Sequence, residues 1–204
     1  IVFPLFSAYS KKSSGIGDLN DLKLIINFCK KSGNSILQLL PMNELGGVFC
    51  PYDSVSSFAL EPAYLSIALI PSSDTEEVKN KLSNINRYFP AGHTYIDYRI
   101  KEIKIGLLRE IYLKGSCDCE ELRAFIHENS YWLDDFALFK ALKKYHNDKA
   151  WFDWEEKYKN RDKASLDAFR KENEKEIAFQ VWLQWHLYEQ FRSAKKHAQE
   201  NNIL

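Results

Sequence analysis

The chain of 204 residues contains no run of apolar residues that approaches the ~20 needed for a membrane-spanning helix. It also lacks an excess of either charge, because its 28 lysines and arginines balance its 28 aspartates and glutamates. Nucleic acids and anionic membranes attract a surplus of positive charge, which this composition does not provide. We therefore expect neither nucleic acid nor a membrane among the partners of this chain.

Sites for metals and nucleotides are also poorly represented. The first residues do not resemble a secretory signal, so we expect the four cysteines to be reduced thiols in a cytoplasmic protein. Cys117 and Cys119 are two positions apart, but no second ligand pair accompanies them, and we expect no metal site. Gly15 and Gly17 lack the third glycine of a dinucleotide fingerprint, so we do not expect a dinucleotide either.

The first forty residues predict a strand, a helix and a second strand. Ile1–Phe6 and Ser35–Leu40 are short apolar runs, typical of parallel strands that are buried on both faces. Between them, Asp18–Ser32 has a helical pattern that Asp18 can cap and Gly33 can end. Its apolar stripe consists of Leu22, Ile25, Ile26 and Cys29. The crossover of such a unit is right-handed, and the fold class predicted is α/β.

Helical patterns dominate the middle of the chain, over Ser72–Arg170. One helix is marked by an apolar stripe that runs from Ile100 to Ile111, and Asp134 with Asp135 is expected to open another. The aromatic segment Trp151–Trp154 lies between helices. It has the composition of a sugar-binding surface, but large aromatic side chains more often fill a small core, and we favour that interpretation.

The end of the chain predicts a long helix over Ile177–Ala198, apolar over more than one side. Ile203 and Leu204 after it are typical of the first residues of a third strand. Before the helical region, Ser56–Leu69 is expected to contain further extended segments.

A polar loop follows the predicted strand Ser35–Leu40. It includes Cys50, Tyr52, Asp53 and Ser54. Loops at the carboxyl ends of buried parallel strands hold the ligand sites of α/β proteins. An aromatic ring beside hydroxyls and a carboxylate suits a sugar, because the ring takes the C–H face and the polar groups take the hydroxyls. The alternative is an ordinary surface loop, and these residues alone favour that alternative.

Six longer motifs occur along the chain in a specific order and spacing. They are PLFSAYSKKSSGIGDLNDL, SILQLLPMNE, CPYDSVSSFALEPAYLSI, YIDYRIKEIKIGLLREIY, YWLDDFALFKALKKYH and EIAFQVWLQWHLYEQFRSAKKHAQENNI. On these motifs the chain resembles the N-terminal part of the amylomaltases, the 4-α-glucanotransferases of the disproportionating-enzyme family in the α-amylase clan.

The resemblance implies the N-terminal portion of a (β/α)8 barrel with a mainly helical inserted subdomain. Residues 1–71 would hold the first strands, the first helix and the active-site loop. Residues 72–170 would form the helical insertion, and residues 171–204 a long barrel helix that leads into the third strand. A complete barrel has eight strands and about 250 residues, so a longer enzyme is implied.

The resemblance also implies an activity and its substrates. The family transfers α-1,4-glucan chains between 4-linked glucans with retention, so maltooligosaccharides, starch or glycogen are the expected partners. Retention requires two carboxylates roughly 5–5.5 Å apart. In the family they lie on later strands, beyond residue 204, so we assign no catalytic residue here. Transfer between sugars uses these carboxylates and the exclusion of water, so we expect neither a metal nor an organic cofactor.

Substrate-binding residues are carried over from the family's Ser-Pro-Tyr loop. Tyr52 matches the tyrosine that lies against the sugar ring at the cleavage point, and Ser54 falls where the family often has serine. Cys50 replaces the usual serine, and a thiol is a weaker hydrogen-bonding group than a hydroxyl. Asp53 occupies a variable position, and its role is open.

Two further hypotheses come from other classes of protein. The chain can be a non-catalytic glucan-binding module derived from such an enzyme, or a helical interaction domain without a sugar ligand. Carboxylates further along the same reading frame distinguish the enzyme from the module. Binding of glucan distinguishes both of these from the interaction domain.

Overall fold

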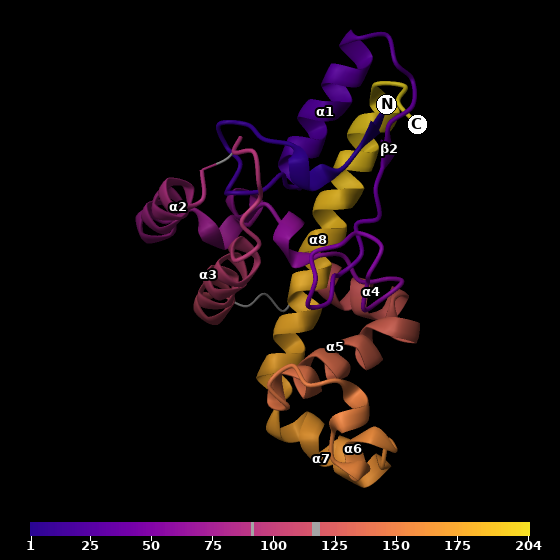
Figure 1. The fold of residues 1–204 in the computed structure, drawn as a ribbon. Helices are drawn as coiled ribbons and strands as arrows, with labels where there is room; N and C mark the ends of the chain where they lie inside the picture. Colours follow the sequence, from indigo (N-terminus) through magenta and orange to yellow (C-terminus); the bar gives the residue numbers. More distant parts are fainter. Residues whose placement is uncertain (91, 116–118) are drawn as a thin grey trace. The chain divides into compact units, whose positions relative to one another are not determined.

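The computed structural model describes residues 1–90, 92–115 and 119–204 (Figure 1). The chain divides into two compact units. The first consists of Ile1–Ser116 with His186–Leu204, and the second of Cys117–Trp185. The long helix α8 (Glu174–Glu200) contributes its first residues to the second unit and the remainder to the first.

The first unit contains a parallel pair of strands, β1 (Val2–Phe3) and β2 (Gln38–Leu39), with Val2 opposite Gln38. The backbone of Leu204 joins β2 from its other side, because its N–H donates to Ser35 O at 2.8 Å and its C=O accepts from Leu37 N at 2.7 Å. Successive residues of a strand direct their backbone groups to opposite sides. The strand order is therefore β1, β2 and then Leu204.

Both strands are shorter and more exposed than the sequence indicated. Each has two residues instead of six, and the expectation of burial on both faces is wrong for the described chain, since Val2 is 63% exposed and Ile36 57% exposed. Strand burial depends on elements that cover the sheet faces, and the described residues leave these two side chains in solvent.

Helix α1 (Leu19–Lys31) connects β1 to β2 and begins at the predicted cap. The Asp18 carboxylate accepts hydrogen bonds from Asn20 N and Asp21 N, and Asp21 completes a capping box. Leu22, Ile26 and Cys29 are buried, whereas Ile25 is only half-buried. The helix ends before Gly33, whose φ of +72° lies in the left-handed region that favours glycine.

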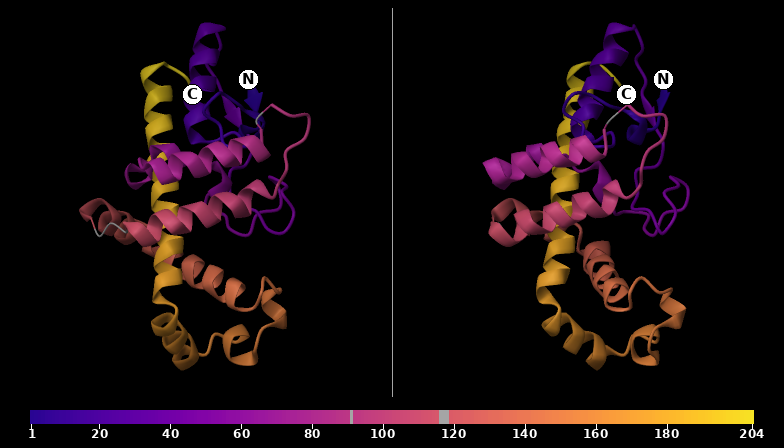
Figure 2. Two further views of the ribbon diagram at one scale, coloured as in Figure 1. Left: turned by 90° about the vertical axis from the view of Figure 1, so that its left-hand side faces the viewer. Right: turned by 60° about the vertical axis from the view of Figure 1, so that its left-hand side comes forward.

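The C-terminal part of α8 lies beside α1 within the first unit (Figures 1 and 2). Polar contacts join the two helices along their length, from Lys23 to Ser193 at 2.9 Å and from Asn27 to His197 at 2.7 Å. The side-chain amide of Gln190 also bonds both backbone groups of Ser66, each at 2.9 Å. These contacts attach α8 to segments that are far away in the sequence.

Ser56–Leu69 differs from the extended segments that the sequence indicated. It contains two short 3-10 helices, η2 (Pro62–Tyr64) and η3 (Ile67–Leu69), and a third, η4 (Pro71–Ser73), follows it. Pro62 and Pro71 each occupy a first-turn position, where the missing N–H and fixed φ of proline favour a helical turn. The extended conformation survives before them, at the antiparallel bridges Asn43–Leu60 and Leu45–Ser54.

Two amphipathic helices complete the first unit, α2 (Glu76–Tyr88) and α3 (Ile100–Lys114). They lie side by side in Figure 2, and exposed ion pairs join Lys81 to Glu110 and Lys114 to Glu77. The predicted stripe of α3 is buried, except that Ile103 is 39% exposed.

The second unit is helical. It contains α4 (Glu120–Glu128), α5 (Ser130–Tyr145), η5 (Trp151–Asp153), α6 (Glu156–Lys159), α7 (Lys163–Glu172) and the start of α8. One hydrophobic cluster in it consists of the buried residues Leu138, Ala141, Leu142, Trp154, Tyr158, Leu166 and Phe169.

Two expectations for the second unit need correction. Helix α5 begins at Ser130, before Asp134 and Asp135, because the backbone of Asn129 already accepts the first helical hydrogen bonds. The aromatic segment is only partly a core element. Trp154 is buried, whereas Trp151 and Phe152 are 56% and 61% exposed. Among the described residues, no helix combines the length and the apolar character needed to cross a membrane.

Acid should destabilise the fold through His186 on α8. This side chain is buried, and burial lowers its pKa from 6.5 to about 4. As the pH falls below 6.5, the unfolded state binds a proton that the folded state does not. Above pH 6.5, protonation of His186 therefore does not reduce the free energy of unfolding. Between pH 6.5 and pH 4 the free energy of unfolding falls by roughly 1.4 kcal/mol per pH unit.

Urea unfolding at several pH values measures this dependence. His186→Gln should reduce the loss of stability on acidification, whereas His127→Gln, at an exposed position on α4, should not. An identical pH slope for wild type and His186→Gln would contradict the assignment.

Two exposed apolar side chains, Leu24 and Phe28, lie one turn apart on α1 and are 50% and 59% exposed. We expect the isolated 204-residue chain to self-associate, because such surface favours contact with other apolar surface. Leu24→Lys with Phe28→Lys should reduce the association in sedimentation velocity, and Tyr88→Lys on α2 is the control. A monomeric wild-type chain with one cooperative melting transition would refute this expectation.

Candidate functional site

The loop after β2 folds back on itself as an irregular hairpin. Leu45 and Ser54 form an antiparallel bridge, in which Val55 N donates to Glu44 O at 2.8 Å and Gly46 N donates to Asp53 O at 3.4 Å. The loop between these two positions, residues 46–53, is called the tip loop below. Because both of its ends are hydrogen-bonded to each other, the tip loop has a fixed base.

The tip loop and Ser54 bring the four predicted binding residues into one turn. Asp53 N donates to Cys50 O at 2.9 Å, and Cys50 N donates to Val48 O at 2.8 Å. Tyr52 is 74% exposed, Asp53 and Ser54 are exposed, and Cys50 is half-buried. A ring at this position is free to stack against a ligand that approaches from solvent.

An aromatic cluster adjoins the tip loop. Phe49 stacks on Tyr98 with ring centroids 4.5 Å apart and meets the edge of Phe6 at 6.1 Å. Phe6 belongs to η1 (Leu5–Ser7), which follows β1, and Tyr98 precedes α3. The sequence interpretation missed Phe49 and Tyr98. In the sequence, the position of Phe49 directly before the predicted binding residue Cys50 was the one local indication that it lies at the site.

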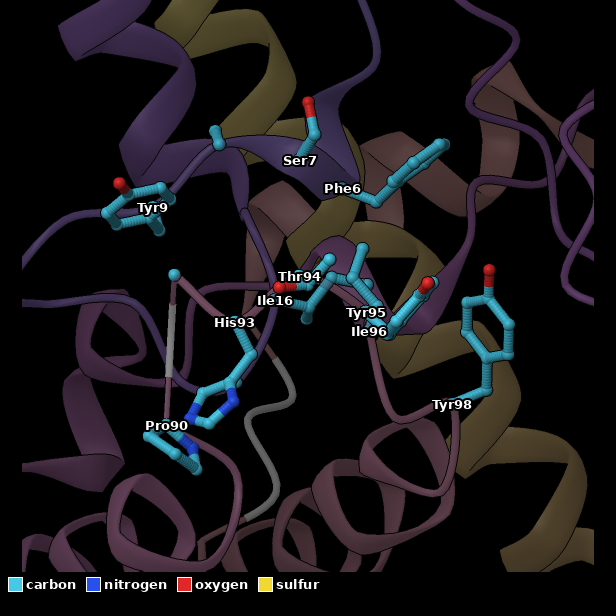
Figure 3. A pocket seen from close by; sticks show the side chains of 13 residues that line it. Phe6, Ser7, Tyr9, Ile16, Pro90, His93, Thr94, Tyr95, Ile96 and Tyr98 are labelled. Atoms are coloured by element: carbon cyan, nitrogen blue, oxygen red, sulfur yellow. The ribbon is translucent and has the colours of Figure 1, made fainter.

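A cavity of about 280 Å³ lies beside this cluster, within the first unit (Figure 3). Its walls come from the end of η1, from Gly15 and Ile16, and from Pro90 and residues 92–96 and 98, between α2 and α3. The labelled side chains in Figure 3 are Phe6, Ser7, Tyr9, Ile16, Pro90, His93, Thr94, Tyr95, Ile96 and Tyr98. Aromatic rings and hydroxyl groups therefore line one concave surface at the carboxyl end of β1.

Gly15 and Ile16 line this cavity, and the close packing around Gly15 and Gly17 leaves no room for a side chain. Gly15 has a φ of +75°, and a Cβ there would lie 2.9 Å from Ile100 and Phe89. A Cβ at Gly17 would lie 2.0 Å from Leu5 O. Glycine permits these close approaches of the backbone.

Charged side chains lie buried at η2. Glu61 and Lys104 are each 0% exposed, and Lys104 Nζ donates to Ala63 O at 2.6 Å. Burial lowers the pKa of Lys104, and the negative charges of Asp18, Asp21 and Glu61 oppose that shift. Sequence reasoning missed this cluster, although Lys104 lies on the apolar stripe of α3, four residues after Ile100 and four before Leu108.

The carboxylates of this region differ in their access to a ligand. Asp53 is exposed, whereas Glu44 is 1% exposed and Glu61 is fully buried. Among the described residues, no three histidine, cysteine or acidic side chains are close enough together to hold a metal ion. Cys117 and Asp118 lie outside the described residues, and Cys119 is half-buried.

Comparison with known proteins decides the family. Residues 3–204 match the family described as 4-alpha-glucanotransferase. The chain belongs to this family. The membership predicted from the ordered motifs is confirmed. The chain is 33% identical to a 4-alpha-glucanotransferase of Chlamydia pneumoniae over its whole length, which is 39% of that protein. It is 32% identical to the 4-alpha-glucanotransferase of Aquifex aeolicus, over 93% of the chain and 38% of that protein.

Solved amylomaltases share the fold. The amylomaltase of Corynebacterium glutamicum superposes with a TM-score of 0.79 at 20% identity, over 98% of this chain and 28% of that one. An amylomaltase of Streptococcus agalactiae, in complex with acarbose, gives 0.77 at 19% identity, over 100% of this chain and 41% of that one. The chain thus spans well under half the length of these relatives, and has the fold of their matching part.

Proposed function

We propose that the protein containing this chain is a 4-α-glucanotransferase that moves α-1,4-glucan chains between 4-linked glucans with retention. One observation carries the proposal: the chain belongs to the 4-alpha-glucanotransferase family. The solvent-exposed ring of Tyr52 on the tip loop supports it. Maltooligosaccharides, starch or glycogen are the proposed substrates. The acarbose complex of a structural neighbour supports a carbohydrate ligand.

The role proposed for Tyr52 is to stack against the sugar ring at the cleavage point. Glycosyl transfer passes through a flattened ring with partial positive charge. An aromatic face attracts positive charge, so the stacking is stronger in the transition state than in the ground state. Interactions of this kind accelerate the chemical step.

Polar residues beside Tyr52 are proposed to contact glucosyl hydroxyls. Ser54 offers a hydroxyl and Asp53 a carboxylate, both exposed next to the ring. Cys50 contributes a thiol, which is a weaker hydrogen-bonding group, where the family usually has serine. The catalytic carboxylates are proposed to lie outside residues 1–204. Glu44 and Glu61 are too buried to reach a sugar, and Asp53 alone is not a pair.

The architecture proposed for the whole protein is a (β/α)8 barrel in the cytoplasm. The parallel pairing of β1 and β2, which α1 connects, supports their assignment as strands one and two of that barrel. The hydrogen bonds of Leu204 support a third strand that begins there. Residues 72–170 are proposed as a helical insertion between residues 1–71 and the barrel helix of residues 171–204.

Tyr52→Ala tests the proposed function in the full-length protein that contains residues 1–204. Loss of the ring should lower kcat for maltotriose disproportionation roughly tenfold, which corresponds to about 1.4 kcal/mol, with a smaller change in KM. Tyr52→Phe keeps the ring and should retain most of the activity. Unchanged turnover in the alanine variant would rule out the role of Tyr52, and a protein that binds glucan without transferring it would support the binding-module hypothesis.

Cys50 provides a second test of the same surface. A maleimide should label the half-buried Cys50 before Cys29, which is 0% exposed, and glucan should slow the labelling. Cys50→Ser should keep or slightly increase transfer, since a hydroxyl is the stronger hydrogen-bonding group. Rapid labelling of Cys50 without loss of activity would show that this side chain does not contact the substrate.

A further inference from the structure

The backbone of Leu45, at the base of the tip loop, needs hydrogen-bond partners outside the hairpin. Leu45 and Ser54 form a non-hydrogen-bonded antiparallel pair, in which the hydrogen bonds are made by the residues on either side of Leu45, Glu44 and Gly46. The N–H and C=O of Leu45 itself therefore point away from Ser54. Leu45 is 3% exposed, so water cannot replace missing partners, and a buried unpaired backbone group is costly.

One ion pair satisfies both backbone groups of Leu45. Leu45 N donates to Glu61 Oε2 at 2.9 Å, and Leu45 O accepts from Lys101 Nζ at 3.1 Å. The same two side chains are bonded to each other, with Lys101 Nζ 2.9 Å from Glu61 Oε2. The pair thus takes the place that a neighbouring strand would occupy beside Leu45.

Both members of the pair are held by other elements. Glu61 caps η2 and accepts from Ala63 N through its second oxygen at 3.1 Å. Lys101 belongs to α3, and Lys104 on the next turn of that helix donates to Ala63 O. Side chains of α3 therefore contact η2 and the base of the tip loop through adjacent turns.

This arrangement points to positioning rather than chemistry. The Glu61 side chain is 0% exposed and that of Lys101 13% exposed, so neither is available to a sugar. Loss of either partner would leave a buried charge and a buried backbone group of Leu45 without their bonds, a large penalty for a local change.

We propose that Glu61 and Lys101 are positioning residues that hold the tip loop in the conformation that presents Tyr52 to glucan. The proposal rests on the proposed function for the role of Tyr52 itself. The position of the loop is a separate property, and it is measured without any glucan.

The first measurement is hydrogen exchange over residues 44–55 in the full-length protein that contains residues 1–204. Lys101→Met should speed exchange in this segment at least tenfold, because the bonds to Leu45 are weakened. Lys114→Met is the matched control. It removes the same charge from the same helix, and among the described residues it breaks only the exposed pair with Glu77. Lys101→Arg keeps the charge and should restore part of the protection. Unchanged exchange in Lys101→Met would overturn the proposal.

The second measurement distinguishes positioning of Tyr52 from general loss of stability. Misplacing a substrate-contacting group by about 1 Å costs up to roughly a hundredfold in rate, and we expect kcat/KM to fall at least tenfold in Lys101→Met. In a Tyr52→Ala background the same substitution should cost less than about twofold, because its target is already gone. Equal losses in both backgrounds would overturn the proposal, since they would show that Lys101 does not act through Tyr52.

Two further outcomes are separable. If Tyr52→Ala alone leaves transfer unchanged, the proposed function of Tyr52 fails, while the exchange result still decides whether Lys101 holds the tip loop. If Lys101→Met does not fold, Lys101→Gln, which removes the charge but keeps a donor, takes its place in both measurements with the same criteria.

Discussion

The carboxylate of Glu61 is the constraint on which the candidate site depends. A charge that is removed from water must be paired and hydrogen-bonded, and Glu61 meets this requirement through Leu45, Ala63 and Lys101. Each of these partners belongs to a different segment: the hairpin, η2 and α3. The cost of burying one charge is thereby offset by bonds that fix three segments against each other. An exposed aromatic ring at a surface turn becomes a defined feature because its base is fixed in this way.

The parts of the fold that the sequence predicted well are those with local causes. Helix α1 was located by the Asp18 cap, the apolar stripe and Gly33, all of which act within a few residues. The positions and the parallel pairing of the strands were predicted correctly. Their length and burial were predicted wrongly, because both depend on neighbouring elements that the sequence of the strand itself does not specify. The start of α5 was misplaced for a related reason, since Asp134 resembles a helix start whereas the turn at Asn129 begins the helix.

In the candidate site, too, features with a local sequence signal were predicted and features that depend on distant residues were not. Ordered motifs were enough to identify the family. They also selected Tyr52 as a binding residue, and that role stays a prediction. The supporting residues were not predictable, because Glu61 and Lys101 are separated by 40 positions and neither has a local pattern that marks a buried ion pair. A lysine on an otherwise apolar stripe, such as Lys104, is the kind of signal that could have indicated buried charges. The stacking of Phe49 on Tyr98 had no signal of comparable strength.

The double hydrogen bond between Gln190 and Ser66 has a consequence for how much chain the fold can accommodate. It closes a loop of 124 residues, and the whole second unit lies within that loop. The hydrogen bond from the amino group of Ile1 to Ile36 O spans only 35. The entropy of closing a flexible loop grows only logarithmically, by about 0.6 kcal/mol per doubling, so the longer loop costs roughly 1 kcal/mol more. Two hydrogen bonds contribute a comparable amount, about 0.5–1.5 kcal/mol each. On this scale, the entropy of closing the segment between Ser66 and Gln190 is offset by the two hydrogen bonds that close it.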